Sequence, residues 1–513
     1  MNGHSHASSL GAAALQDDKA ALSPPLLLRS LISSSPSRLL AWLVAAALVP
    51  LLGAAIAAAP ARASHAQALT FEAPGELLSA RTRPHALAQL DSLGVHALRV
   101  VLYWRNVAPS PRSSRRPSFD ATDPTRYAWG EYDALLAAAR QRHWTVLLDV
   151  SGPVPRWATS RRRDYVTHPD PMEFGRFMTA VGRHYGSQVP LFSIWNEPNH
   201  PAFLQPQFAP NGAPASPRLY RALFQAGYAG LQASGLRAPR VLMGDTAPTG
   251  ADSGHGLHDV APLAFLRGAL CLDTRYRKAR TCSALPAAGY AHHAYTKPAG
   301  PLYRPPSRDD VTIGVLSRLT HALDRAARAH ALRSGLSLYL TEFGIQSKPN
   351  RFLGVPVAQQ AEFDAISERI AYDNPRVKAF SQFLLRDDSL GGRPGASVRS
   401  DGSSTGFQTG LEYHSGKAKP LFGAFRIPLT VNRLRGGFAL WGLVRPTSGV
   451  THVDVLVQDS GSRRARVLRR GVTTDRLGYW RLHVSDASAR TWRVRWRSPS
   501  GTTYVGPPIR AYR

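Results

Sequence analysis

The chain is short of cysteine, of acidic residues and of internal repeats, and each shortage narrows what the protein can be. Two cysteines in 513 residues are too few for a disulfide-dense scaffold or a thiolate metal centre. The 34 acidic residues do not balance the 63 lysines and arginines, so the formal charge is +29. No internal repeat is evident, which excludes a repeat architecture. A hydrophobic content of 43% over this length predicts two folded units with large cores.

The strong positive charge has two interpretations. The first is compositional, because the basic residues are overwhelmingly arginine and are dispersed through a sequence rich in alanine and proline. The second is attraction to an acidic partner such as an anionic glycan of the cell envelope. No nucleic-acid-binding motif accompanies the charge, so nucleic acid is not an expected partner.

The N-terminal region and the two cysteines bear on cellular location. Residues 39–59 form an uncharged apolar run, followed by small-residue cleavage motifs that end at Ala63 and Ala68. This pattern is typical of an export signal, and the run is also long enough to be a retained membrane anchor. We therefore expect a secreted or cell-envelope protein. In that setting Cys271 and Cys282 are expected to form a loop-closing disulfide rather than a metal site.

From residue 69 to residue 426, apolar strand-like runs alternate with helical patterns. The eight strand candidates cover residues 69–73, 96–104, 145–150, 189–196, 240–246, 290–295, 337–342 and 378–385. Helical patterns lie between them, over residues 85–93, 129–142, 171–185, 217–234, 309–334 and 357–372. Eight such units predict an α/β fold, the (β/α)8 or TIM barrel, whose catalytic groups sit where strands end. A doubly wound open sheet is the alternative, but no glycine-rich phosphate turn follows the first strand.

The pattern changes near residues 427–429. Short alternating runs follow, separated by Gly, Ser, Asp and Pro, over residues 438–444, 453–457, 465–468, 479–484, 491–497 and 503–505. Such spacing predicts a C-terminal all-β sandwich over residues 430–513, after a barrel over 69–426 and an export region over 1–68. Trp480, Trp492 and Trp496 fit either a sugar-binding surface or the sandwich core, and their alternating spacing favours the core.

Two glutamates stand where strand candidates end. Glu197 follows the fourth apolar run in the segment Trp-Asn-Glu-Pro, and Glu342 ends the seventh in the segment Thr-Glu-Phe-Gly. Because barrel strands all end at one face, the two carboxyl groups are expected to meet there. Paired carboxyls across a sugar acetal are the usual apparatus of glycoside hydrolysis. Asn-Glu-Pro alone is a weak signal, since it also fits a strand that turns into a loop.

With these residues the chain resembles the retaining glycoside hydrolases of the large (β/α)8-barrel clan, including its cellulase-like and β-xylosidase-like families. The resemblance covers most of residues 69–426, and its most specific element is Asn-Glu-Pro after the fourth strand. It implies that Glu197 is the acid/base and that Asn196 binds the sugar 2-hydroxyl. It also implies that Glu342 is the nucleophile, held ionised by Arg99 of the second strand.

Other residues extend the resemblance or depart from it. His293 and Tyr295 match the sixth-strand pair that lines the same site in the clan, and residues 419–425 look like its closing helix. The clan commonly places a tryptophan at the end of the eighth strand, where this chain has Gln382 and Phe383. Among the tryptophans near strand ends, Trp157 is the best placed to stack on a sugar.

The implied chemistry is a double displacement. Glu197 must protonate the departing sugar oxygen, so desolvation and a neighbouring negative charge are expected to raise its pKa. Asp149 and Asp245 also end strands and are weaker candidates for the cleft, whereas His292 is one step out of phase and expected to be structural. No cluster has the spacing of a metal site, so we expect the chemistry to need no metal or other cofactor.

The leading hypothesis is an exported retaining glycosidase that hydrolyses O-glycosidic bonds, expected to be β-linked, in an oligo- or polysaccharide. A transglycosylase on the same barrel is the first alternative, because the same intermediate can be transferred to a sugar. A non-catalytic glycan-binding protein of the cell envelope is the second. The presence of both Glu197 and Glu342 argues against it.

Overall fold

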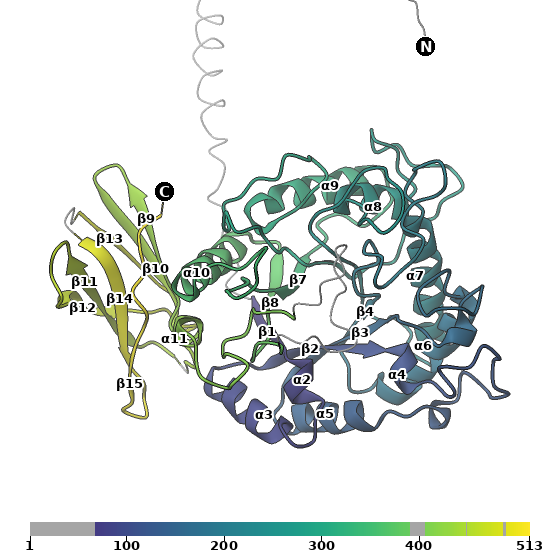
Figure 1. The fold of residues 1–513 in the computed structure, drawn as a ribbon, viewed down its shortest axis with the longest axis horizontal. Coiled ribbons are helices and arrows are strands. Elements are labelled where there is room, and N and C mark those ends of the chain that lie inside the picture. The colour runs from purple at the N-terminus through teal and green to yellow at the C-terminus, as the bar shows by residue number, and fades with distance from the viewer. Residues whose placement is uncertain (1–66, 390–405, 448, 486–488, 513) are drawn as a thin grey trace, which may run out of the picture. The chain divides into compact units, whose positions relative to one another are not determined.

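The computed structural model describes residues 67–389, 406–447, 449–485 and 489–512 (Figure 1). The N-terminal apolar segment lies outside these residues. Within the described ranges, no helix has both the length and the apolarity needed to cross a membrane.

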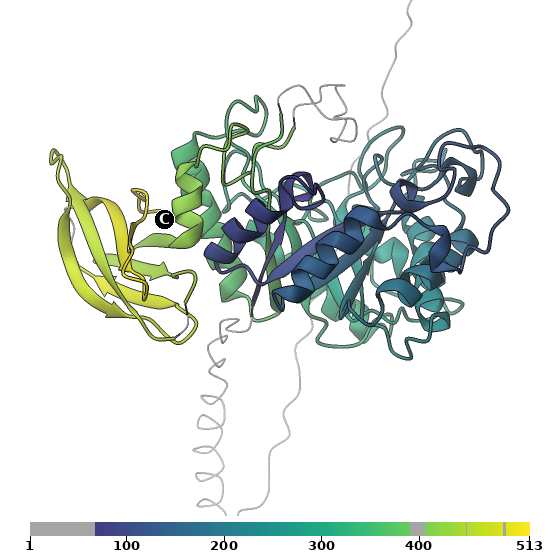
Figure 2. The ribbon, with the colours of Figure 1, turned by 90° about the horizontal axis from the view of Figure 1, so that it is seen from below.

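Eight parallel strands close into a barrel in chain order, which confirms the TIM-barrel prediction and rules out the open sheet. The strands are β1 (Ala68–Glu72), β2 (Ala97–Tyr103), β3 (Thr145–Ser151), β4 (Leu191–Ile194), β5 (Val241–Thr246), β6 (Gly289–His292), β7 (Leu338–Phe343) and β8 (Val377–Phe383). Helices surround them (Figures 1 and 2); the main ones are α3 (Arg83–Ser92), α5 (Gly130–Gln141), α6 (Pro171–Tyr185), α7 (Ser216–Ala233), α8 (Pro262–Ala269), α9 (Leu316–Arg328) and α10 (Val357–Asp373).

Side-chain alternation along the strands separates two environments. In β2, Leu98, Val100 and Leu102 belong to the large apolar core between the strands and the helices. Arg99 and Tyr103 alternate with them and therefore point into the barrel. The strands are thus buried on both faces, and the polar groups inside the barrel gather near the ends of the strands.

Each predicted helical range contains a helix, but one helix is shorter than expected and three helices were not predicted, including the short α2 (Pro74–Leu77) and α4 (Trp104–Val107). The pattern over residues 309–334 contains a 3₁₀ turn, η3 (Ile313–Val315), before α9, so the helix is shorter than expected. The crossover between β5 and β6 contains α8, which the periodicity did not predict. The same crossover carries the predicted disulfide between Cys271 and Cys282.

The C-terminal residues form a sandwich of two antiparallel sheets, as predicted. A helix, α11 (Pro420–Arg426), leads into it, and the strand order is β13-β10-β9 in one sheet and β12-β11-β14-β15 in the other. The strands are β9 (Leu429–Leu434), β10 (Gly437–Gly442), β11 (His452–Asp459), β12 (Arg466–Thr473), β13 (Trp480–Val484), β14 (Ala489–Arg497) and β15 (Thr503–Val505). Of these, β9 was not predicted.

The three tryptophans of the sandwich are core residues. Trp480, Trp492 and Trp496 are each no more than 2% exposed and belong to one apolar cluster between the sheets. Their rings are therefore not available for stacking on a sugar. The first sheet contacts the barrel, where Trp441 of β10 packs on Tyr372 of α10 at 5.4 Å between ring centroids.

Candidate active site

The candidate site lies at the carboxyl end of the barrel, where the segments after β4, β5 and β6 meet β7. The backbone is strained here, since φ is 75° at Trp195, 39° at Glu197 and 45° at Asp245. Residues with side chains seldom adopt positive φ, and such strain concentrates at functional sites. Gly152, after β3, leaves room for the Trp195 ring, because a Cβ atom added to Gly152 would lie 2.6 Å from that ring.

A bulge in β5 turns Asp245 into the barrel. The register between β5 and β6 shifts at Gly244, whose φ is 109° and whose added Cβ would lie 2.5 Å from the Ala291 carbonyl oxygen. Glycine is therefore required at that position. The buried Asp245 carboxylate accepts hydrogen bonds from the Ser193 hydroxyl and, at 2.5 Å, from the Thr341 hydroxyl.

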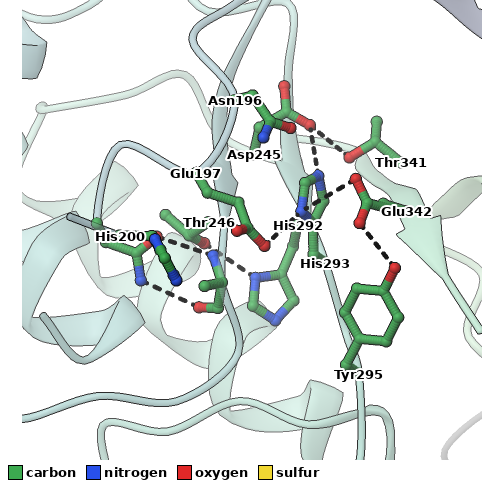
Figure 3. A network of polar contacts seen from close by, with 12 residues as sticks. Asn196, Glu197, His200, Asp245, Thr246, His292, His293, Tyr295, Thr341 and Glu342 are labelled. Atoms are coloured by element: carbon green, nitrogen blue, oxygen red, sulfur yellow. Dashed lines mark hydrogen bonds and ion pairs between the residues drawn. The ribbon is translucent and has the colours of Figure 1, made fainter. Parts of the chain in front are cut away.

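Glu197 and Glu342 face each other with His293 between them (Figure 3). Each of the three residues offers an atom within 4.8 Å of the others. The His293 Nδ1 atom lies 2.9 Å from a Glu197 oxygen and 3.8 Å from a Glu342 oxygen, and its Nε2 atom lies 3.4 Å from Asp245. The Tyr295 hydroxyl donates to the other Glu342 oxygen at 2.7 Å. The structure thus brings together the four residues that the sequence favoured and Asp245, which the sequence offered as a weaker candidate.

Arg99, at 1% exposed, ties four strand ends together. Its Nη1 donates to Glu72 at 2.5 Å and to Glu342 at 3.0 Å, and its Nη2 donates to Asp149 at 2.7 Å. The same Nη2 donates to the Asn196 side-chain oxygen at 2.6 Å, so the side-chain NH2 group of Asn196 points away from Arg99. The guanidinium therefore fixes both Glu342 and the residue that precedes Glu197.

Glu72 is a residue of this network that the sequence reading missed. It is the last residue of β1, and a carboxylate at the end of the first strand was a signal like that of Glu197. Burial, opposed by the Arg99 charge, raises the pKa of Glu72 to about 7. Burial and the charge of Asp245, opposed by Arg99, raise the pKa of Asp149 to about 8. Both carboxyls therefore hold protons at mildly acidic pH, and Arg99 remains available to Glu342.

The expected raised pKa of Glu197 is not found. Burial alone would raise it, but the hydrogen bond and positive charge of His293 outweigh burial, so the pKa of Glu197 is lowered. Burial would lower the pKa of His293, yet the charge of Glu342, the ion pair with Asp245 and the hydrogen bond with Glu197 raise it to about 10. The proton of this pair therefore resides on His293. This ion pair was not predicted from the sequence, because the two residues are far apart in the chain.

His292 is structural, as its phase predicted. Its Nε2–H donates to the Val311 carbonyl oxygen at 2.8 Å, and its Nδ1 accepts from the Thr246 hydroxyl at 2.9 Å. Burial lowers the pKa of His292 to about 4, so the ring is neutral. Two adjacent histidines thus carry different charges because they point to different sides of the strand.

The prediction that Trp157 stacks on a sugar is wrong. The ring is 3% exposed and packs edge-on against Trp104, with its N–H donating to the Pro109 carbonyl oxygen at 3.1 Å. A ring enclosed on these sides offers no face to a ligand. The turn after β3 carries Trp157 into the core between strand and helix instead of towards the barrel axis.

A cavity of about 230 Å³ opens beside Glu197 and Glu342. Phe407 lines it and lies 6.4 Å from the Tyr295 ring in a stacked orientation, so the cavity has an aromatic wall to which Trp157 does not contribute. Gln382 is buried, and its amide donates to the Phe383 and Thr409 carbonyl oxygens. It therefore does not replace the tryptophan that the clan places after β8. Phe407 was not predicted from the sequence, because it lies well after the end of β8 and not at a strand end.

The short distances among Glu197, His293 and Glu342 also suit a metal ion in principle. A metal-binding histidine, however, must be neutral and must offer a lone pair. Here the two ring nitrogens of His293 face carboxylates that are already paired with it, Glu197 at 2.9 Å and Asp245 at 3.4 Å. The donor set therefore fits proton sharing better than metal binding.

Comparison with known proteins gives a likeness of fold. No protein-family model and no curated protein matches the sequence. A GH39 enzyme from Xanthomonas axonopodis pv. citri is 14% identical, with a TM-score of 0.48, over 84% of this chain and 94% of that chain. A monomeric β-xylosidase from Caulobacter crescentus CB15 is 15% identical, with a TM-score of 0.48, over 88% and 96%. A glucosidase from Croceicoccus marinus is 12% identical, with a TM-score of 0.48, over 84% and 98%. These solved structures are glycoside hydrolases, the class that the sequence resembles.

Proposed function

We propose that the chain is a retaining glycoside hydrolase in which Glu342 is the nucleophile and Glu197 the acid/base. The observation that carries the proposal is the approach of the two carboxyls, with oxygens within 4.8 Å. Retaining enzymes place their carboxyls about 5–5.5 Å apart, whereas inverting enzymes need about 6.5–9.5 Å to admit a water molecule. The short distance supports direct attack by a carboxylate.

The reaction proceeds in two displacements. In the first, the Glu342 carboxylate attacks the anomeric carbon, the bond to the departing oxygen breaks, and Glu197 protonates that oxygen. In the second, water attacks the same carbon, the ester bond to Glu342 breaks, and Glu197 takes a proton from the water. Arg99 and Tyr295 donate to different oxygens of Glu342 and hold it in one orientation for both steps.

His293 supplies the proton that Glu197 lacks before the first step. The negative charge of Glu342 helps to hold this proton on His293. When Glu342 forms an ester, its charge disappears, and the proton passes more readily through Glu197 to the departing oxygen. In the second step the ester is hydrolysed, so Glu342 regains its negative charge and the proton taken from water returns through Glu197 to His293. One proton thus moves between His293 and Glu197 as the nucleophile changes its charge.

We also propose that the protein is exported. The disulfide between Cys271 and Cys282 supports this, because such bonds persist in oxidising compartments. The apolar segment over residues 39–59 supports it from the sequence. The substrate is then a glycan outside the cytoplasm, and the nearby cavity of about 230 Å³ accommodates part of a chain rather than a long polymer.

The test is hydrolysis of a panel of aryl β-glycosides by the mature chain, with Glu342→Ala and Glu197→Ala beside it. We expect turnover on at least one sugar, loss of turnover in Glu342→Ala, and rescue of that variant by azide as a glycosyl azide of inverted configuration. In Glu197→Ala, azide should give an azide of retained configuration, because it then replaces water in the second step. Normal turnover in either variant would show that the roles are assigned wrongly.

A further inference from the structure

The second sheet of the sandwich has an outward surface made of arginines. In β14, Trp492, Val494 and Trp496 point into the sandwich core, so Arg493, Arg495 and Arg497 point outward. Arg470 lies on β12, on the other side of β11 from β14; it is exposed and close enough to Asp454 of β11 to lower the pKa of that carboxyl. These four residues are called the arginine face below.

The charge of the arginine face is largely uncompensated. Asp454 of β11 lies directly opposite Arg495 and pairs with it at 2.7 Å. Arg493 and Arg497 bond instead to neutral carbonyl oxygens, those of Gly506 at 3.4 Å and Gly501 at 3.3 Å. Within the described residues neither forms an ion pair. Guanidinium groups that recur on one face of a strand, about 7 Å apart, repel one another, so folding alone does not explain them.

The positive charge is concentrated in this part of the chain. Residues 429–513 contain sixteen arginines and four aspartates, with no lysine and no glutamate. Residues 69–428 contain 43 basic and 28 acidic residues in a stretch more than four times as long. Composition alone would spread the excess evenly, so the sandwich carries more positive charge per residue than the barrel.

The surface at the arginine face is hollowed. A depression of about 340 Å³ is lined by His452, Asp454, Arg495, Arg497 and Thr503. Its lining is polar and charged, so an extended polar chain suits it better than an apolar helix. The Asp454 carboxylate accepts from two nitrogens of Arg495, which shows that these guanidiniums can grip a carboxylate on this face.

We propose that the arginine face binds a linear polysaccharide that carries carboxylate groups. Arginine suits this partner because its planar donors match a carboxylate in pairs. A single-stranded nucleic acid is disfavoured, since such surfaces present aromatic rings for base stacking. Here Trp492 and Trp496 are buried, and Tyr504 stacks on Trp496 at 5.7 Å. The choice of a polysaccharide rests on the proposed glycosidase function, whereas the anionic character rests on the arginine face itself.

The test measures binding of the mature chain to immobilised polygalacturonate, with its methyl ester as the uncharged match. We compare the double variant Arg493→Glu/Arg497→Glu with Arg237→Glu/Arg240→Glu, which changes net charge equally in the loop before β5. Both control residues are exposed. We expect the arginine-face variant to weaken binding about tenfold or more at low salt, and the control to change it less than about twofold. The methyl ester should bind weakly to every protein.

Equal binding by both variants, or equal binding to the methyl ester, would overturn the proposal. So would duplex DNA that binds more tightly than polygalacturonate and loses affinity in the arginine-face variant, because the surface would then be a nucleic-acid site. Arg493→Gln/Arg497→Gln tests the same point with milder changes if the glutamate variant does not fold. Turnover of aryl glycosides, measured in parallel, should be unchanged in all variants. Its absence in the wild-type chain would count against the glycosidase proposal and not against anion binding.

Discussion

The barrel and the sandwich use arginine in opposite ways. In the barrel, Arg99 is fully enclosed and donates to the carboxyl groups of Glu72, Asp149 and Glu342. In the sandwich, Arg493 and Arg497 face outward and have no acidic partner among the described residues. A buried cation requires fixed partners that accept its hydrogen bonds. Through these bonds the cation holds a reactive group, here Glu342, in place. A surface cation needs no partner within the chain and can serve one outside it.

The largest expected difference is in turnover. Glu342→Gln keeps the shape of the side chain but removes the nucleophile, so we expect turnover to fall by about 10⁴-fold or more. Asp454→Asn, the matched change in the sandwich, should leave turnover within about twofold, because Asp454 pairs with Arg495 of the arginine face and is not part of the active site. Steady-state kinetics on the same aryl glycoside measure both. Similar losses in the two variants would mean that the carboxyl of Glu342 has no special role.

The second largest difference between the barrel and the sandwich should be in the stability lost when an arginine is replaced. Arg99→Met leaves several buried carboxyls without their cation, so we expect the free energy of unfolding to fall by about 3–5 kcal/mol. Arg495→Met removes a partly exposed ion pair and should cost less than about 1 kcal/mol. Denaturant unfolding of both variants gives the comparison. A cost for Arg99→Met as small as that for Arg495→Met would contradict the account of the buried network.

The pH profile tests the role of His293. Its pKa is raised to about 10, so the pair with Glu197 keeps its proton until the pH rises through that value. In His293→Ala, Glu197 must hold the proton itself, and kcat/KM should decline at a pH lower by about 2 units or more. An alkaline limb in the same place in both proteins would show that His293 does not hold the proton. Arg481→Ala, on the sandwich, should leave the profile unchanged.

The disulfide should have the smallest effect on turnover. Cys271→Ser with Cys282→Ser opens a loop in the crossover before β6, and we expect a loss of about 2–3 kcal/mol with little change in turnover. Thermal unfolding in the presence and absence of a reductant provides the same comparison on the unmodified chain. A large loss of turnover with unchanged stability would place the loop in the substrate cleft.

The fold could be predicted because its signals are local. Each barrel strand is a short apolar run, and the runs alternate with helical patterns, so chain order fixed the closed sheet. Glu197 and Glu342 were found for the same reason, since each lies at a strand end. Phe407 and the His293–Glu197 ion pair were not found, because they depend on segments that only folding brings together. Trp157 was misplaced because the direction of a side chain in a turn has no periodic signal.

The central claim is that Glu342 and Glu197 act as a retaining pair. The most direct test is proton NMR of the first product released from an aryl β-glycoside, recorded before the free sugar equilibrates between its anomers. The account predicts that the β-anomer appears first and the α-anomer only later, by mutarotation. An α-anomer as the first product would mean inversion, with water rather than Glu342 attacking the anomeric carbon.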